Sequence, residues 1–200
     1  TEISYVPYTF GELLTFSQST MDKFSKFEFI LKGIHTNGIE KHNLAFFDFI
    51  YISLLRKLSS FKDDTLILQY VCPECGAQNS VVEQLTNLKF QELNVPGIPI
   101  VIKDDNGGEL HFVPLTVGAY MNLWKKNKLE DPLEMYASVV ANLPPEKSKD
   151  IINKATGELS MAISYADDAL VFGLEPIILN CSECGAPTTL EMEDPEIYIS

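Results

Sequence analysis

The chain has 200 residues, of which 46% are hydrophobic, so it is long enough and apolar enough to bury the core of one domain. Its 28 acidic and 15 basic residues give a formal net charge of −13, which repels the phosphate backbone of nucleic acids and argues against direct nucleic-acid binding. The longest apolar run, residues 43–55, is shorter than the roughly 20 residues of a membrane-spanning helix and contains Asp48, so no membrane segment is predicted. The opening TEISYVPYTF has no basic region followed by an apolar stretch, and no export signal is predicted.

Two helices are predicted near the start of the chain, because apolar residues recur there at the helical period. The first extends from about Thr20 to Gly33. The second lies between His42 and Phe61, and we expect it to be buried on much of its circumference, with its aromatic residues in the core rather than on a partner-binding face. Its predicted apolar stripe consists of Phe47, Ile50, Tyr51, Leu54, Leu55 and Leu58.

Residues 98–175 are predicted to form a β-hairpin followed mostly by helix. Strands around Ile100–Ile102 and Leu110–Val113 flank a turn rich in Asp, Asn and Gly, which is typical of a hairpin. Thr116 is predicted to cap the next helix, and Asp131-Pro132 supplies a cap and a first helical residue for another. Further helices are predicted over residues 131–143, 144–156 and 158–173.

All four cysteines lie in two nearly identical motifs, CPECGA at residues 72–77 and CSECGA at residues 181–186, which we call the two knuckles. A Cys-x-x-Cys turn directs two thiolates at one ion, and the glycine that follows permits the positive φ that the turn requires. Two such turns complete a tetrahedron around a metal. The sequence therefore predicts one structural Zn²⁺ ion, with the ligands Cys72, Cys75, Cys181 and Cys184.

Redox-active dithiols, disulfides and an iron–sulfur cluster are the alternatives for these cysteines. Catalysis at the metal is not expected, because four thiolates leave no open position for water or substrate. Glu74 and Glu183 lie inside the knuckles, and we interpret them as solvated residues rather than general bases.

The sequences around the knuckles predict two hairpins, over residues 68–86 and 176–193, which would face each other across zinc as a ribbon. A usual ribbon has its knuckles only about 15 to 20 residues apart, whereas here residues 98–175 are inserted between the two halves. The predicted fold class is α+β: a single helix-rich domain over residues 1–200, with β-hairpins and a split zinc ribbon.

No group of residues in the sequence indicates an enzyme. His35, His42 and His111 have no neighbouring nucleophile, and a lone histidine is more often a surface or hydrogen-bonded residue than a catalyst. Asp167 and Asp168 are consecutive on a predicted helix, so their side chains point about 100° apart and do not face one substrate. We therefore predict a protein without enzymatic activity.

The knuckles, the helical start and the segment FVPLT at residues 112–116 together resemble the baseplate hub assembly proteins of T-even (T4-like) bacteriophages, over nearly the whole chain. Members of that family are hub subunits or hub assembly chaperones. The resemblance implies a non-enzymatic role in building the hub of a contractile tail, through contacts with other baseplate hub or tape-measure proteins. It also implies a location in the host bacterial cytoplasm during assembly, or in the virion tail baseplate. Only the four cysteines carry over, as zinc ligands.

Two other functions are compatible with the sequence. A zinc-ribbon regulator would bind transcription or replication proteins through protein surfaces, and salt-dependent retention on DNA would favour it. An enzyme with a site that the motifs do not disclose would instead have a polar pocket lined by residues with strongly shifted pKa values.

Overall fold

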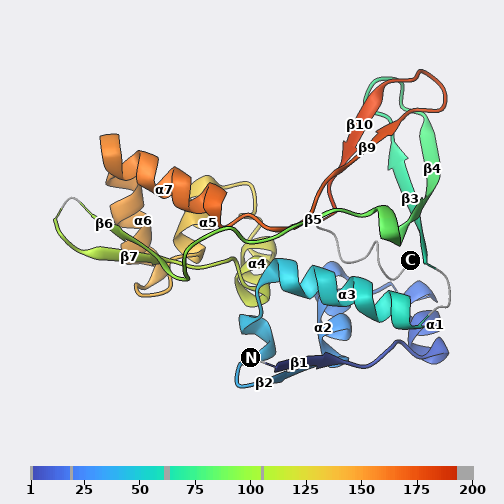
Figure 1. Cartoon of the computed structure of the whole chain (residues 1–200), viewed down its shortest axis with the longest axis horizontal. Helices are drawn as coiled ribbons and strands as arrows, with labels where there is room; N and C mark the ends of the chain where they lie inside the picture. Colours follow the sequence, from blue (N-terminus) through green and yellow to red (C-terminus); the bar gives the residue numbers. More distant parts are fainter. Residues whose placement is uncertain (1, 19, 61–63, 105, 193–200) are drawn as a thin grey trace. The chain divides into compact units, whose positions relative to one another are not determined.

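The computed structural model describes residues 2–18, 20–60, 64–104 and 106–192. Over these residues the fold is α+β, with seven α-helices and five two-stranded antiparallel sheets, which confirms the predicted combination of helices and β-hairpins (Figure 1). In the part of the chain that the structure describes, no helix is both long enough and apolar enough to cross a membrane.

The chain divides into two compact units. The first unit comprises the residues up to Gly38, Phe47–Gln91 and the residues from Gly173 onward, and the second comprises Ile39–Phe46 and Glu92–Phe172. Both knuckles belong to the first unit. The expectation of a single domain over residues 1–200 stays a prediction.

Three helices and one small sheet form the N-terminal part of the first unit. The predicted helices are confirmed as α2 (Lys23–Lys32), which Asp22 caps by accepting the Ser25 N–H at 2.7 Å, and α3 (Phe46–Ser60). The sequence analysis did not predict α1 (Phe10–Gln18) or the pairing of β1 (Glu2–Tyr5) with β2 (Ile34–Asn37).

Helix α3 is buried on much of its circumference, as predicted, but its buried face is not the predicted stripe. Tyr51 is 40% exposed and packs against the ring of Phe90, so the expectation that it lies in the core is wrong. Ser53 and Arg56 are buried in its place. A stripe drawn from apolar residues alone misses these two polar positions. The Ser53 hydroxyl donates to the Phe49 carbonyl of the same helix at 2.7 Å, whereas Arg56 depends on partners elsewhere in the chain.

Arg56 is 1% exposed, and the chain around it is arranged to satisfy its charge. Its Nε donates to the carbonyl of Val6 at 2.7 Å and its Nη1 to the carbonyl of Ile30 at 2.6 Å, while the guanidinium lies over the ring of Tyr8. A Cβ atom at Gly33 would clash with the guanidinium group of Arg56. Only glycine therefore leaves room for this side chain at the end of α2.

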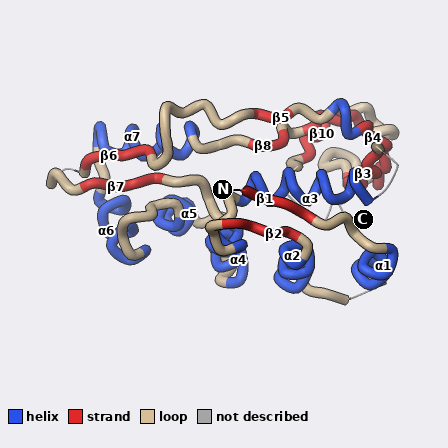
Figure 2. The backbone as a smooth tube through the Cα atoms, turned by 60° about the horizontal axis from the view of Figure 1, so that its bottom comes forward, coloured by secondary structure: helices blue, strands red, loops and turns tan. Residues whose placement is uncertain are grey.

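The second unit is a hairpin with four helices. Strands β6 (Ile100–Lys103) and β7 (Glu109–Phe112) confirm the predicted hairpin, and Figure 2 shows them side by side. Helices α4 (Val117–Lys125) and α5 (Pro132–Ser138) begin at the predicted caps, since Thr116 accepts the Ala119 N–H at 3.2 Å and Asp131 the Glu134 N–H at 3.3 Å. The last two helices are α6 (Pro145–Lys154) and α7 (Gly157–Ala169).

The second unit has a hydrophobic core of its own, to which β7, α7 and the segment after α5 contribute. Ion pairing supports it at the surface, where Lys149 of α6 bonds Glu134 of α5 at 2.8 Å. Gly157, predicted to separate two helices, is instead the first residue of α7. The buried residues of this core are Leu110, Phe112, Val139, Val140, Leu159, Ile163, Ala166 and Leu170.

Candidate metal centre

Each knuckle joins the two strands of a β-hairpin, as predicted. The first hairpin pairs β3 (Thr65–Val71) with β4 (Gln78–Gln84), and the second pairs β9 (Ile177–Asn180) with β10 (Pro187–Leu190) (Figure 1). The predicted segment 68–86 thus starts three residues inside the hairpin, and residue 193, at the end of the other segment, lies outside the described residues.

A short sheet holds the chain segments that lead out of the first hairpin and into the second. Strand β5 (Phe90–Gln91) pairs with β8 (Gly173–Leu174), and the Glu175 N–H donates to the Lys89 carbonyl at 2.9 Å. This pairing brings together two segments that are far apart in sequence. The second hairpin therefore starts where the first one ends.

The two knuckles have the same backbone conformation. In the first, the N–H of Cys72 donates to the carbonyl of Ala77 and the N–H of Gly76 to the carbonyl of Cys72, both at 2.9 Å. The same two bonds recur in the second knuckle, at the same length. Gly76 and Gly185 have φ values of +74° and +73°, which a side chain would strain. The repeated sequence therefore folds into a repeated turn.

The four sulfur atoms converge from the two knuckles. The Sγ atoms of Cys72 and Cys184 are 3.7 Å apart, as are those of Cys75 and Cys181, and all four lie within 4.8 Å of one another. A metal–sulfur distance of about 2.3 Å places the corners of a regular tetrahedron about 3.8 Å apart. The thiols are free, and their close contacts join one knuckle to the other. This geometry can hold one metal ion.

The centre is half covered by the protein. Cys72 and Cys181, the first cysteine of each knuckle, are 1% and 4% exposed, whereas Cys75 and Cys184 are exposed. An ion there would have protein on one side and solvent beyond its thiolate shell on the other. Glu74 and Glu183 are exposed at the knuckles, in agreement with their interpretation as solvated residues.

Asn79 on β4 joins the two knuckles, and the sequence analysis missed it. Its side-chain Nδ2 donates to the carbonyl of Ala77 at 3.0 Å and lies 3.6 Å from Sγ of Cys181. Its Oδ1 accepts the backbone N–H and the hydroxyl of Ser182, both at 2.9 Å. Such bonds around a ligand fix its orientation. An amide at an inward position of a strand, two residues after a knuckle, is the signal that could have identified it.

Tyr70 makes a second connection between the hairpins. Its hydroxyl donates to the carbonyl of Asn180 at 3.0 Å, and its ring is buried. Burial raises the pKa of Tyr70, and so does the charge of the nearby cysteines. The phenol therefore stays a hydrogen-bond donor at neutral pH.

The repeat is not symmetric around Asn79. Thr188 holds the position in the second hairpin that Asn79 holds in the first, and Pro73 corresponds to Ser182. Because proline has no N–H group, the counterpart of the bond between Asn79 and Ser182 cannot form. The hydroxyl of Thr188 is buried and has no hydrogen-bond partner among the described residues. One bridge thus connects the knuckles where a symmetric site would have two.

The neighbouring cysteines oppose ionisation of the Cys75 thiol. The backbone N–H groups of Cys184 and Glu183, with help from Asn79, lower the pKa of Cys181 to about 6. The backbone at Ala77 acts to lower the pKa of Cys75, but the neighbouring cysteines and burial raise it to about 12. A dication would remove this repulsion, and four sulfur ligands suit a thiophilic metal.

The other residues that the sequence analysis considered do not join this centre. Among the described residues, the four cysteines are the one group of His, Cys, Asp and Glu side chains placed to share an ion. His111 lies 3.2 Å from Glu109 in the β6–β7 hairpin. Burial raises the pKa of Asp167, and adjacent Asp168 raises it further. Both aspartates belong to α7 and are not part of the four-cysteine group.

Comparison of the chain with protein-family models, with curated proteins and with solved structures gives no match.

Proposed function

We propose that this chain is a non-enzymatic assembly protein, whose two hairpins are held together as a split ribbon by one structural Zn²⁺ ion. The observation that carries the proposal is the convergence of four sulfur atoms from knuckles whose cysteines lie 106 and 112 positions apart. A four-thiolate site has no open position, so it stabilises structure rather than catalysing a reaction.

Zinc fits the donor set better than the alternatives do. A redox dithiol would act within one Cys-x-x-Cys motif, whereas here the 3.7 Å contacts join different knuckles. An iron–sulfur cluster places several iron and sulfide atoms between its cysteines, and it would hold them farther apart than one ion does. A single tetrahedral zinc ion agrees with both observations.

The biological role we propose is assembly of a bacteriophage baseplate hub, as a hub subunit or an assembly chaperone, in the infected bacterium. The knuckles and residues 112–116 support it by their resemblance to the T-even family. The net charge of −13 favours protein partners over nucleic acid. The proposed partners are other hub or tape-measure proteins.

Native mass spectrometry of the full chain, purified from cells that also express candidate hub proteins, tests the metal and the partner together. We expect a mass excess of one zinc ion and a bound hub or tape-measure protein. Zinc without such a partner, combined with salt-sensitive retention on DNA, would replace the hub role with that of a regulator.

Two variants locate the metal in the same spectra. Cys75→Ser removes one ligand and should abolish the zinc excess, whereas Glu74→Gln changes the neighbouring exposed residue and should keep it. Equal zinc content in both variants would remove the four-cysteine site from the proposal.

A further inference from the structure

The far edge of β4 has backbone groups available for another strand. The Cys72 N–H donates to the Ala77 carbonyl, and the Leu85 N–H donates to the Asp64 carbonyl, so a hydrogen-bonded pair lies at each end of the β3–β4 ladder. Between these ends, hydrogen-bonded pairs alternate with pairs whose N–H and C=O groups point away from the partner strand. The N–H and C=O groups of Ser80 and Val82 therefore point away from β3. No described strand pairs with this edge.

The second hairpin provides an internal comparison. Its strand β10 has only four residues and begins with Pro187, which has no N–H to offer. At the matching position β4 has Gln78, and the strand continues for seven residues without a proline, a lysine or a break in its register. Proteins usually protect open edges with short strands, prolines or lysines. The edge of β10 is protected in this way, and the edge of β4 is not.

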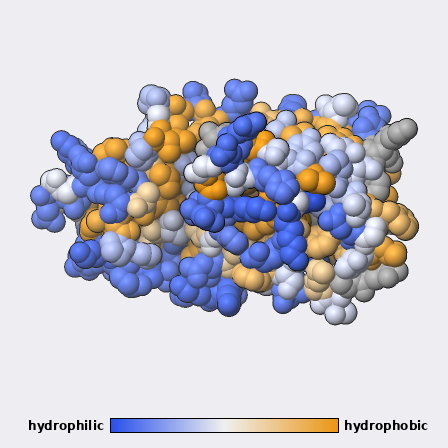
Figure 3. All heavy atoms as spheres, turned by 90° about the horizontal axis from the view of Figure 1, so that it is seen from below, coloured by the Kyte–Doolittle hydropathy of each residue, from blue (hydrophilic) through white to orange (hydrophobic). Residues whose placement is uncertain are grey.

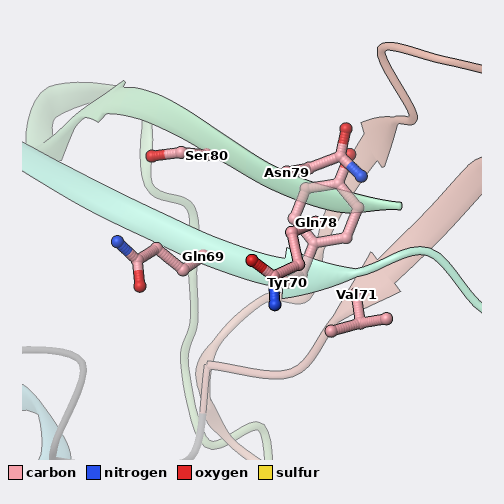
Figure 4. Close-up of a pocket in the computed structure, with 6 residues that line it drawn as sticks. All are labelled: Gln69, Tyr70, Val71, Gln78, Asn79 and Ser80. Carbon is pink, nitrogen blue, oxygen red and sulfur yellow. The ribbon is translucent and has the colours of Figure 1, made fainter. Parts of the chain in front are cut away.

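The outer face beside this edge has exposed apolar side chains among polar ones. Ile67 and Val82 face each other across the two strands and are 56% and 64% exposed, and Val71 is exposed on the same face. A depression of about 430 Å³ lies at the end of the hairpin next to the knuckle (Figure 4). It is lined by three consecutive cross-strand pairs, namely Gln69, Tyr70, Val71, Gln78, Asn79 and Ser80.

Exposed apolar side chains alone would not identify a binding surface. Figure 3 shows hydrophobic residues among hydrophilic ones on the face that it displays, which is normal for proteins. Phe10 on α1 and Tyr165 on α7 are even more exposed, but nothing around them indicates what would cover them. At β4, by contrast, the outward-pointing backbone groups of the edge indicate that a β-strand would cover it.

The negative charge of the two hairpins predicts that the side chains of that strand are basic. Residues 65–84 and 177–190 contain Glu74, Glu83 and Glu183 but no Lys, Arg or His. A zinc ion with four thiolates adds a net charge of about −2. A second copy of this chain, with its net charge of −13, would be repelled.

We propose that the outer edge of β4 binds an extended, basic segment of a partner protein as a third strand. The inference rests on the proposed protein-binding function and deepens it. Main-chain hydrogen bonds to Ser80 and Val82 fix the segment, its apolar side chains pack beside Val82, and its basic side chains meet the acidic residues of the hairpins. The backbone edge thus selects an extended segment, and the negative charge of the hairpins selects basic side chains.

Fluorescence polarisation with the zinc-loaded full chain tests this inference. The probes are labelled peptides of alternating valine and lysine, or of alternating valine and glutamate. We expect the lysine peptide to bind, more weakly as salt rises, and the glutamate peptide not to bind. Equal binding of both peptides, or no binding of the lysine peptide at about 1 mM, would overturn the proposal.

Three variants locate the binding edge. Ser80→Pro removes an outward N–H without removing a hydrogen bond between β3 and β4. Val82→Lys places a positive charge at the edge, which repels a basic segment. Each variant should weaken binding about tenfold or more. Thr189→Lys places the same charge on the second hairpin and should change binding by less than about threefold. Full binding by both β4 variants would exclude this edge. So would a concentration-dependent dimer of the parent chain that Val82→Lys dissolves.

The same variants separate this inference from the proposed function. If Val82→Lys still carries zinc and still captures a hub protein, the assembly role stands and the β4 inference fails. If the lysine peptide binds at β4 while no hub protein is captured, the inference stands and the hub role fails.

Discussion

At the scale of single residues, the polar side chains of Arg56 and Asn79 have roles that a pattern of apolar residues cannot predict. Arg56 is buried and binds backbone carbonyls from two other segments of the first unit. Asn79 bonds both the first knuckle and Ser182 of the second. In each case one side chain connects segments that the chain order keeps apart, and a buried polar group must be satisfied in this way.

Asn79→Ala should loosen the metal centre. The substitution leaves the Ser182 N–H without its partner and removes the amide beside Cys181, so we expect zinc affinity to fall by about tenfold or more and stability by about 1–2 kcal/mol. Competition with a chromophoric chelator measures the affinity, and urea unfolding measures the stability.

Thr188→Val is the matched control, because it removes a buried hydroxyl that has no described partner. We expect unchanged zinc affinity and equal or higher stability. Similar losses in both variants would mean that Asn79 acts by packing alone.

At the scale of secondary-structure elements, the sequence predicted local features well. Caps and turns act within a few residues, and Thr116, Asp131 and the turn before β7 are all used as predicted. Helix α1 was missed although Thr9 and Glu12 form a capping box, with bonds of 2.8 and 3.2 Å. This motif predicts the start of α1.

Other elements could not be read from the sequence, because they depend on distant partners. The pairing of Tyr5 with Ile34 joins segments that α1 and α2 separate. At the metal centre, the cysteines were predictable from their spacing, but Asn79 and Tyr70 acquire their roles only where the two hairpins meet. A pattern within one segment contains no information on what lies opposite it.

The cap of α5 should make a pH-dependent contribution to stability. Asp131 bonds Lys128 at 2.9 Å and accepts the Glu134 N–H, and these contacts lower the pKa of its carboxyl group below the usual 3.8. Because the folded pKa is depressed, the stabilisation is fully present above the unfolded pKa and is lost as pH falls through the folded one. We expect Asp131→Ala to lower stability near neutral pH, as measured by urea unfolding.

Thr116→Ala is the control for this prediction, since the Thr116 hydroxyl caps α4 but does not titrate in this range. Its cost should be similar near neutral pH and should persist in acid, whereas the cost of Asp131→Ala should shrink below about pH 4. A constant cost for both variants would show that the charge of Asp131 contributes nothing.

At the scale of the whole molecule, removal of the metal should unfold the protein in part. The second unit has a separate core and contains none of the cysteines. We expect chelation, followed by hydrogen exchange, to raise exchange in β3, β4, β9 and β10 while the backbone around Leu110 and Ile163 stays protected. Loss of protection in both units together would mean that the metal supports the whole chain, as in one cooperative domain.

The separation of the knuckles also determines when the centre can form during synthesis. Cys181 follows Cys75 by 106 positions, so the entire stretch from Glu92 to Phe172 is translated between them. At about 5–20 residues per second, the first pair of thiols waits on the order of 10 seconds for the second. Throughout that interval the nascent chain carries half a coordination sphere, while the second unit can already fold. A ribosome that stalls before Cys181 therefore leaves a product with only two of the four thiols, and we expect metal retention to distinguish it from a chain that contains both knuckles.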